Sequence, residues 1–329
     1  MRIATIDAGT TNTRTRIWEN ERVVSEADAA VGVRNTAMDG NNKKLTAAIH
    51  DTLQQAAAKA GGSPELILAA GMLTSNVGII EIPHISAPVT LDELAAAMVQ
   101  QVVPEIAPVP IWFVPGIKNM ADADLTPTNI TDMDIMRGEE TEAAGLLTRC
   151  RLSGRTVLVL PGSHNKYIAV DAGQRILGCM TTIAGELLHS LTFDTILADS
   201  VGRSFAESFD AEAFLRGAAY RKDLGLGHAA FMARILAMFR QYTKTQAQNY
   251  LLGLLLADDL QSLKASRIFA GLEESVFLVA GKSVMQQAYV CLLEAEGWKV
   301  QLASEEQQQA LSGFGALALA KRRGLTACG

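Results

Sequence analysis

Residues 1–18, MRIATIDAGTTNTRTRIW, predict a strand, a tight turn and a second strand antiparallel to the first. An apolar run that ends at Ile6 brings Asp7 to the turn, and alternation of residue types resumes at Thr13. Gly9 can take backbone angles closed to other residues, so the turn can offer amide groups and hydroxyls to a phosphate. An ordinary hairpin with an acid near its start is the alternative, and the motif alone does not decide between them.

A second copy of this hairpin lies half a chain later, at residues 156–170, TVLVLPGSHNKYIAV. The two copies align without a gap, so Gly162, Ser163 and Asn165 fall on the glycine, a threonine and the asparagine of the first turn. Two copies predict two similar lobes that arose by duplication. Each lobe would contribute a hairpin that binds phosphates in the cleft between the lobes.

One difference between the copies bears on metal binding: Leu160 in the second copy stands where the first has Asp7. Only the first lobe keeps the acid, so we expect Asp7 to hold a hydrated Mg²⁺. We expect His164 and Lys166 of the second hairpin to balance the charge of the phosphates.

Five motifs carry a resemblance to a known family. They are DAGTTNTR (7–14), AAGMLTSNVG (69–78), MRGEETEAAG (136–145), LPGSHNKYIAV (160–170) and TIAGELLHSL (182–191). The paired hairpins resemble the sugar kinase, Hsp70 and actin superfamily, and the full set is similar to the 2-dehydro-3-deoxygalactonokinases.

The resemblance implies an α/β protein with the two-lobed actin-like ATPase (ribonuclease H-like) fold. In that fold, duplicated mixed sheets are flanked by helices and the active site lies in the interlobe cleft. Residues 1–150 would form an N-terminal lobe with the first hairpin and the sugar-acid site. Residues 151–329 would form a C-terminal lobe with the second hairpin and the adenosine site. The polar stretch 149–154, which ends in glycine, is the expected boundary.

ATP and Mg²⁺ are the implied cofactors. The residues expected to bind the nucleotide are Gly9, Thr10, Thr11, Asn12 and Arg14 in the first hairpin, Gly162, Ser163, His164, Asn165 and Lys166 in the second, and Gly281, Lys282 and Ser283 further on. These last three residues resemble the end of a P-loop, but the P-loop motif needs a glycine at the position where this chain has Val276. A glycine between a strand and a helix N-terminus can still receive a nucleotide, and the superfamily places adenosine there.

The acceptor and the chemistry are expected on two further stretches. Residues 71–76, GMLTSN, follow a buried strand, which is where α/β sheets place ligands. Together with the MRGEE and AGE motifs, they give the expected substrate-binding residues Met72, Thr74, Ser75, Asn76, Arg137, Gly185 and Glu186. The candidate catalytic acids are Asp7, Glu139 and Glu140, any of which could be the base. Acids in a first helical turn also suit the positive helix end without any chemistry.

Composition limits the alternatives. The chain has 329 residues, 49% hydrophobic and 19% charged, which is typical of a globular protein of about two domains. Its net charge of -6 argues against nucleic acid as a partner. The four cysteines have no metal-binding spacing and are expected to be small buried residues, as in a reducing compartment. Apolar runs are too short to span a bilayer, so we expect a cytoplasmic protein without a membrane partner.

Periodicity predicts the remaining elements. We expect helices over 41–60, 91–103, 211–220, 229–242 and 245–263, after Gly138, Gly185 and Gly281, and at the end of the chain. Short strands are expected at 22–24, 66–70, 111–114, 167–170, 175–179, 273–280 and 299–302.

The function that the resemblance implies is phosphoryl transfer from ATP to the terminal (6-) hydroxyl of 2-dehydro-3-deoxy-D-galactonate, in galactonate catabolism. Such transfer is mostly positioning and charge neutralisation, which two hairpins and one metal can supply. One alternative is an exopolyphosphatase or nucleotide phosphatase of the same superfamily, because GEETEAAG also resembles its glutamate motif. Another is a non-catalytic actin-like nucleotide-binding protein. A small-molecule sugar acid is the expected partner, and a homodimer is compatible with the sequence.

Overall fold

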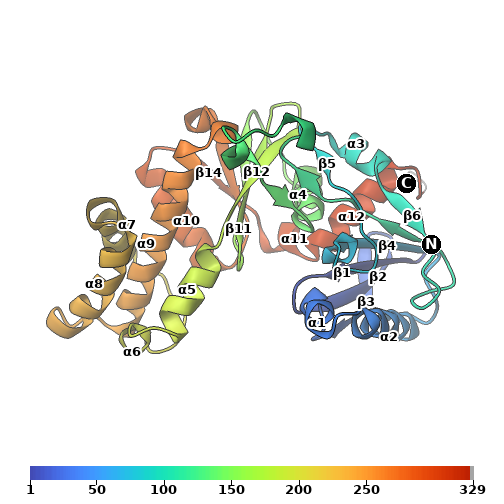
Figure 1. The fold of residues 1–329 in the computed structure, drawn as a ribbon, viewed down its shortest axis with the longest axis horizontal. Coiled ribbons are helices and arrows are strands. Elements are labelled where there is room, and N and C mark those ends of the chain that lie inside the picture. Colours follow the sequence, from blue (N-terminus) through green and yellow to red (C-terminus); the bar gives the residue numbers. More distant parts are fainter. Residues whose placement is uncertain (327–329) are drawn as a thin grey trace. The chain divides into compact units, whose positions relative to one another are not determined.

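The computed structural model describes residues 1–326 and divides into two compact units (Figure 1). The first unit contains Met1–Leu152, Gln174–Gly178 and the segment that begins at Glu305. The second contains Ser153–Gly173 and Cys179–Ser304. The chain therefore passes from one unit to the other within the expected boundary stretch 149–154. The last segment groups with the first unit, however, which differs from an uninterrupted second lobe over 151–329.

The first unit is built on a six-stranded mixed sheet with the order β3-β2-β1-β4-β7-β6. Its strands are β1 (Ile3–Ala8), β2 (Thr13–Glu19), β3 (Arg22–Ala29), β4 (Leu66–Gly71), β6 (Val99–Gln101) and β7 (Ile111–Phe113). β1 and β2 are antiparallel, as the opening sequence predicts, whereas β4 lies parallel to β1. A separate three-stranded sheet, which the sequence did not predict, contains β5 (Ile85–Ser86), β8 (Ile117–Lys118) and β9 (Ile135–Met136).

Helices cover this sheet because their apolar residues recur on one face. They are α1 (Val33–Asp39), α2 (Lys43–Lys59), α3 (Leu91–Ala96), α4 (Glu139–Arg149), α11 (Glu305–Gln308) and α12 (Leu311–Arg322). Leu45 and Ile49 of α2 are fully buried against Ile6 and Ile67 of the sheet, each contributing about 1.5–3 kcal/mol of hydrophobic stabilisation.

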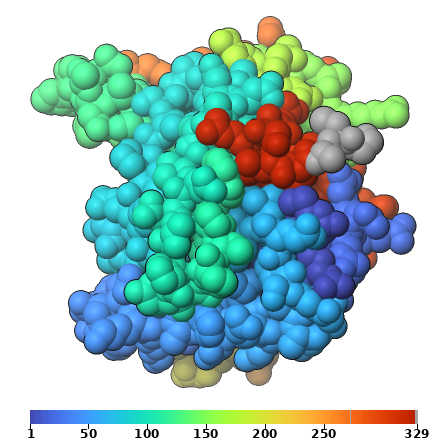
Figure 2. All heavy atoms as spheres, turned by 90° about the vertical axis from the view of Figure 1, so that its right-hand side faces the viewer, coloured from blue at the N-terminus to red at the C-terminus, as the bar shows by residue number. Residues whose placement is uncertain are grey.

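The C-terminal helix α12 belongs to the first unit because small residues let it approach closely. A Cβ on Gly315 would lie 1.7 Å from the carbonyl oxygen of Thr141 in α4, and one on Gly313 would lie 2.7 Å from the ring of Trp18. Figure 2 shows this red helix against the blue and cyan residues of the N-terminal half. Packing across the whole length of the chain therefore holds the first unit together.

The second unit repeats the strand arrangement of the first. Its sheet has the order β12-β11-β10-β13-β14. The strands are β10 (Thr156–Leu160), β11 (Asn165–Val170), β12 (Ile176–Thr182), β13 (Val276–Val279) and β14 (Lys299–Leu302). β10 is antiparallel to β11 and parallel to β13, as β1 is to β2 and β4. This shared order confirms the duplication of mixed sheets that the two hairpins predicted.

The helices of the second unit are α5 (Ala184–Phe193), α6 (Ala198–Val201), α7 (Ala211–Leu224), α8 (Leu226–Phe239), α9 (Lys244–Ala265) and α10 (Ser283–Ala295). α9 is central, with Tyr250, Leu251 and Leu254 fully buried among α5, α7 and α8 (Figure 1). Among residues 1–326, no helix is both long and apolar enough to cross a membrane.

Two sequence-based expectations need correction or completion. The helix expected over 91–103 is wrong in its second half, because α3 ends at Ala96 and Val99–Gln101 form edge strand β6 against β7. Valines at 99, 102 and 103 favour an extended chain once a sheet edge is available. Cys150 and Cys179 are buried as expected and Cys291 is partly buried, whereas Cys328 lies outside the described residues.

Candidate active site

The first hairpin turn, Gly9 to Asn12, is exposed and supported from behind. The Gly9 N–H donates to the Asn12 carbonyl at 2.9 Å, which closes the turn. The first N–H groups of α1 donate to the turn, Val33 to the Gly9 carbonyl at 3.2 Å and Arg34 to the Thr10 carbonyl at 2.9 Å. The predicted phosphate-binding residues of this hairpin are thus held in one place with their hydroxyls accessible.

Asp7 lies at the carboxyl end of β1, opposite Arg14 on β2. Two glycines let the backbone approach it. Gly71 has φ +82, and a Cβ there would lie 3.0 Å from Asp7 Oδ1. Gly138 has φ +118, and its Cβ would lie 3.3 Å from the Cα of Gly71. Because a side chain at either position would be both crowded and strained, glycine is required for the N-terminus of α4 to reach the Asp7 carboxylate.

Acidic groups and their counter-charges are concentrated around Asp7. Loss of water raises the pKa of the Asp7 carboxyl, while the charges of Arg16 and Arg14 and a hydrogen bond from Ser312 oppose the rise. Burial, the charge of Asp7 and then that of Glu139 raise the pKa of Glu142 to about 8. The free energy of this cluster would fall if a cation joined it, because each carboxylate raises the pKa of its neighbour.

This donor set fits Mg²⁺ carried by a nucleotide. Mg²⁺ usually keeps several waters and takes one or two carboxylates plus substrate phosphates. Asp7, partly exposed beside an exposed turn, can supply one such carboxylate. Ser312, from the start of α12, would orient it.

Glu139 and Glu140 differ in what they can reach. Glu139 is partly exposed and accepts a hydrogen bond from the Arg137 N–H at 3.0 Å. Glu140 is 0% exposed, and its Oε2 accepts the Gly138 N–H at 2.6 Å while its Oε1 has no hydrogen-bond partner. Burial and the charge of Glu139 raise the pKa of Glu140 to about 8. The structure therefore places Glu140, a predicted catalytic residue, inside the unit as a support for the start of α4.

The loop expected to bind the acceptor turns two of its hydroxyls inward. Thr74 is fully buried, and its hydroxyl donates to the Gly71 carbonyl at 3.1 Å. The Ser75 hydroxyl donates to the Met72 carbonyl at 2.7 Å. Asn76 is exposed and Met72 is partly exposed, so these two side chains remain accessible.

Arg137 anchors this loop. Its guanidinium donates to the Thr74 carbonyl at 2.6 Å and also to the Thr74 hydroxyl. It further donates to the Ile82 carbonyl at 3.0 Å and to Nδ1 of His84 at 3.1 Å. Burial and the charge of Arg137 lower the pKa of His84 to about 4, so His84 is neutral and its Nδ1 accepts. These contacts hold the guanidinium behind the loop, and the contact of Arg137 with an acceptor stays a prediction.

The second hairpin turn is closed differently from the first. The Gly162 N–H donates to the side-chain Oδ1 of Asn165 at 3.1 Å. The turn is again supported by a helix start, since the Glu186 N–H donates to the Ser163 carbonyl at 3.0 Å. A Cβ on Gly185 would lie 2.1 Å from the Gly162 carbonyl oxygen. Gly185 and Glu186, predicted to bind substrate, therefore support this turn.

His164 and Lys166, the predicted cations of this hairpin, lie in different environments. His164 is exposed, and its Nε2 is 3.2 Å from Glu186 Oε1. Lys166 is only 4% exposed, and its ammonium donates to the Thr181 hydroxyl on β12. The Lys166 side chain thus lies within the sheet and not at the tip of the turn.

The predicted adenosine segment lies next to the second turn. A Cβ on Gly281 would lie 3.2 Å from the ring of Pro161, and Gly281 has φ +105. Lys282 and Ser283 are exposed where α10 begins. A thirteen-residue helix with an accessible N-terminus offers backbone N–H groups to an anion.

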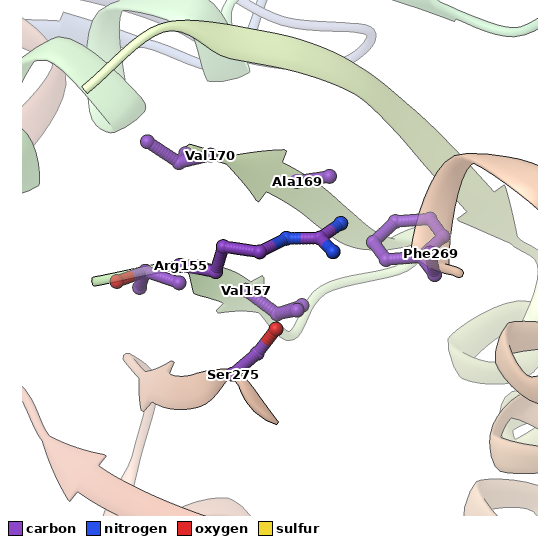
Figure 3. Close-up of a pocket in the computed structure, with 7 residues that line it drawn as sticks. Arg155, Val157, Ala169, Val170, Phe269 and Ser275 are labelled. Atoms are coloured by element: carbon purple, nitrogen blue, oxygen red, sulfur yellow. The ribbon is translucent and has the colours of Figure 1, made fainter. Parts of the chain in front are cut away.

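A small hollow in the second unit lies away from these residues (Figure 3). Val157, Ala169 and Val170 line it, and Arg155 extends across it toward Phe269. It lies at the end of the β10–β11 hairpin opposite the Gly162 turn. It is therefore separate from the candidate phosphate site.

Nothing in the sequence indicated one contributor to the first-unit site. Ser312 is far from Asp7 in the sequence, and only the packing of α12 brings it close. Glu142 belongs to the acidic first helical turn that the sequence indicated together with Glu139 and Glu140.

The family model for 2-keto-3-deoxy-galactonokinase matches residues 7–317. The chain belongs to the 2-keto-3-deoxy-galactonokinase family. Members of this family are carbohydrate kinases, so the protein is a kinase that acts on a carbohydrate, and the sequence-based family prediction is confirmed. No curated protein sequence matches the chain significantly.

One solved structure agrees with the fold of this 2-keto-3-deoxy-galactonokinase family member, and two others are more distantly similar. A candidate 2-dehydro-3-deoxygalactonokinase from Sinorhizobium meliloti is 22% identical, with 97% of this chain and 98% of that chain covered and a TM-score of 0.73. A ROK hexokinase from Thermus thermophilus is 16% identical, with 98% of each chain covered and a TM-score of 0.46. An activator of 2-hydroxyisocaproyl-CoA dehydratase from Clostridium difficile is 11% identical, with 99% and 97% covered and a TM-score of 0.47. With the duplicated strand order, the first of these confirms the predicted actin-like ATPase fold.

Proposed function

We propose that this protein transfers the terminal phosphoryl group of ATP to the 6-hydroxyl of 2-dehydro-3-deoxy-D-galactonate. Membership of the 2-keto-3-deoxy-galactonokinase family supports the substrate class. The structural observation that carries the proposal is the Asp7 carboxylate, which lies beside an exposed glycine-threonine turn and among acids whose pKa values are raised. Such a site favours a cation and a phosphate chain together.

The roles follow from accessibility. Asp7 would hold Mg²⁺, which supplies neutralisation of the charge on the phosphates when bound. Thr10 and Thr11 would contact phosphate oxygens, and Arg14 would add a positive charge opposite Asp7. These groups orient the phosphates for attack and need no covalent intermediate.

Glu139 is the residue we assign as the base. The acceptor oxygen forms a bond to the γ-phosphorus while the bond from that phosphorus to the ADP oxygen breaks, and the acceptor proton passes to a carboxylate. Glu139 is partly exposed next to Gly138, whereas Glu140 has no access to solvent. Accessibility therefore favours Glu139 over Glu140.

The acceptor would lie against the loop that follows β4. Asn76 and Met72 are its accessible side chains, and Arg137 would fix the loop from behind. A loop held by three or more hydrogen bonds loses little entropy when a substrate binds, so Arg137 would act mainly on acceptor affinity.

ADP formation measured with and without a panel of aldonic and 2-keto-3-deoxy sugar acids tests this function. We expect turnover to require one acid of the panel, with 2-dehydro-3-deoxy-D-galactonate giving the highest kcat/KM, and the product to carry phosphate on its terminal oxygen. Phosphate release that is indifferent to every acid would indicate a phosphatase instead. No turnover with any acid, despite binding of ATP, would indicate a non-catalytic nucleotide-binding protein.

A further inference from the structure

One buried carboxylate in the second unit collects three hydrogen bonds on a single oxygen. Asp259 lies on α9, is 4% exposed, and its Oδ2 accepts from Nδ2 of Asn165 at 2.9 Å. The same oxygen accepts from the hydroxyl of Tyr167 at 2.8 Å and from that of Thr182 at 2.8 Å. Asn165 and Tyr167 are 2% and 1% exposed, so these two donors are buried, whereas Thr182 is partly exposed.

The network fixes the orientation of the Asn165 amide. A carboxylate only accepts, so the amide must present its Nδ2 to Asp259. Its Oδ1 then faces the other way, where it accepts the Gly162 N–H at 3.1 Å. The direction of this amide is therefore set from inside the unit, and it closes the second hairpin turn.

The same oxygen also fixes the helix start that supports the turn. Thr182 precedes α5, whose Glu186 N–H donates to the Ser163 carbonyl at 3.0 Å. One acceptor thus holds both the closing side chain of the turn and the segment that leads to its support.

Tyrosines extend the network to α10. The Tyr167 hydroxyl donates to Asp259, so its oxygen accepts from the Tyr289 hydroxyl at 2.7 Å. Tyr289 is 2% exposed on α10, the helix that begins at Ser283 of the predicted adenosine segment. Burial raises the pKa of Asp259, and the three hydrogen bonds oppose that rise.

We propose that Asp259 is a positioning residue that holds the second hairpin turn in the shape that binds the phosphates of a nucleotide. The inference rests on the proposed kinase function. It assigns Asp259 no contact with substrate. The residue acts through Asn165 and Thr182, and its loss should affect phosphate recognition more than adenosine recognition.

Nucleotide binding by the full chain tests this positioning role without any sugar acid. Calorimetry would compare AMP-PNP with Mg²⁺ against adenosine in wild type, Asp259→Leu and Asp259→Asn. Asp259→Leu removes the acceptor and should weaken AMP-PNP binding by about tenfold or more, with adenosine within about twofold of wild type. Asp259→Asn keeps an acceptor oxygen at the same place and should recover most of the AMP-PNP affinity.

A matched control separates positioning from loss of stability. Tyr167→Phe and Tyr250→Phe each remove one buried tyrosine hydroxyl, and the Tyr250 hydroxyl donates to the Ala229 carbonyl at 2.7 Å outside the network. Similar falls in Tm are expected for the two. Of these two, only Tyr167→Phe should weaken AMP-PNP binding, by about threefold. Hydrogen exchange of the Gly162 amide should become faster in Tyr167→Phe and in Asp259→Leu, but not in Tyr250→Phe.

The outcomes separate this proposal from the proposed function. Unchanged Gly162 exchange in Asp259→Leu, or equal losses of AMP-PNP and adenosine affinity in that variant, would overturn the positioning role. If Asp259→Leu does not fold, the comparison of Tyr167→Phe with Tyr250→Phe decides, and equal AMP-PNP affinities in these two would overturn it. Wild-type protein that binds AMP-PNP but phosphorylates no sugar acid would overturn only the kinase function.

Discussion

Replacing the buried acid Glu140 by glutamine should change how stability depends on pH. The Glu140 carboxyl is 0% exposed, and burial and the charge of Glu139 raise its pKa from 4.5 to about 8. The folded protein therefore holds a proton on Glu140 at pH values where the unfolded chain has lost it. The contribution of Glu140 to the free energy of unfolding is fully present below pH 4.5 and is lost as the pH rises through about 8.

The size of the effect follows from the interval between the two pKa values. At about 1.4 kcal/mol per pH unit, an interval from 4.5 to about 8 corresponds to roughly 5 kcal/mol at most. Relaxation of the folded structure and entry of water reduce such penalties. We therefore expect ionisation of Glu140 to lower the free energy of unfolding by about 2–4 kcal/mol above pH 9. Glutamine is neutral at every pH and keeps a carbonyl oxygen to accept the Gly138 N–H. The free energy of unfolding of Glu140→Gln should therefore not show this fall at high pH.

Urea unfolding at pH 6 and pH 9.5 measures the difference. The free energy of unfolding of Glu140→Gln relative to wild type should rise by about 1–2 kcal/mol between the two pH values, because only the part of the interval from pH 6 to about 8 lies between them. Glu105→Gln, a change at an exposed glutamate of the same unit, should move by less than about 0.5 kcal/mol. A constant difference between Glu140→Gln and wild type would show that Glu140 is ionised and solvated in the folded protein, and it would refute the interior placement.

Three further substitutions test the surroundings of Asp7. Ser312→Ala removes a hydrogen bond to Asp7 and should lower kcat about threefold to tenfold with little change in the KM for ATP, and an unchanged kcat would contradict its role. Gly138→Ala puts a Cβ at φ +118 and 3.3 Å from the Gly71 Cα, so it should lower the free energy of unfolding by about 1–3 kcal/mol in a urea titration. A fully stable variant would show that the backbone tolerates the side chain. Arg137→Ala frees the loop at Thr74 and should raise the KM for the sugar acid about tenfold or more while leaving the KM for ATP within about twofold, whereas equal changes would argue against a loop-positioning role.

Local sequence patterns were sufficient to predict the two hairpins and much of the fold. The strand before Asp7 and the turn at Gly9 are encoded within a dozen residues, and the repeat at Gly162 revealed the duplication that the strand order confirms. Helix α9 and strand β14 were also predicted to within a few residues of their observed bounds. Family membership added the chemistry that spacing could not supply.

Features set by distant packing could not be predicted. Residues 99–101 were predicted to be helical because the neighbouring sequence does not reveal that β7 has an open edge with which they can pair. Ser312 reaches Asp7 only because glycines in α12 let that helix pack on α4. Arg137 carries the charge expected of an acceptor site, yet its guanidinium faces Thr74 and the Ile82 carbonyl. Direction of a side chain depends on which neighbours the fold supplies, and the sequence does not encode those neighbours locally.

Sugar-acid-dependent ADP formation in wild type and in Asp7→Asn is the most direct test of phosphoryl transfer at Asp7. With Mg²⁺, ATP and 2-dehydro-3-deoxy-D-galactonate, the wild type should form one ADP per phosphorylated acid and almost none without the acid. Asp7→Asn should lose about a thousandfold or more in kcat, because the interaction acts mainly on charge that develops during transfer, while AMP-PNP affinity stays within about tenfold. Near-normal kcat in Asp7→Asn would show that transfer does not require the Asp7 carboxylate, and a wild-type rate that is the same with and without the acid would show that the protein is not a sugar-acid kinase.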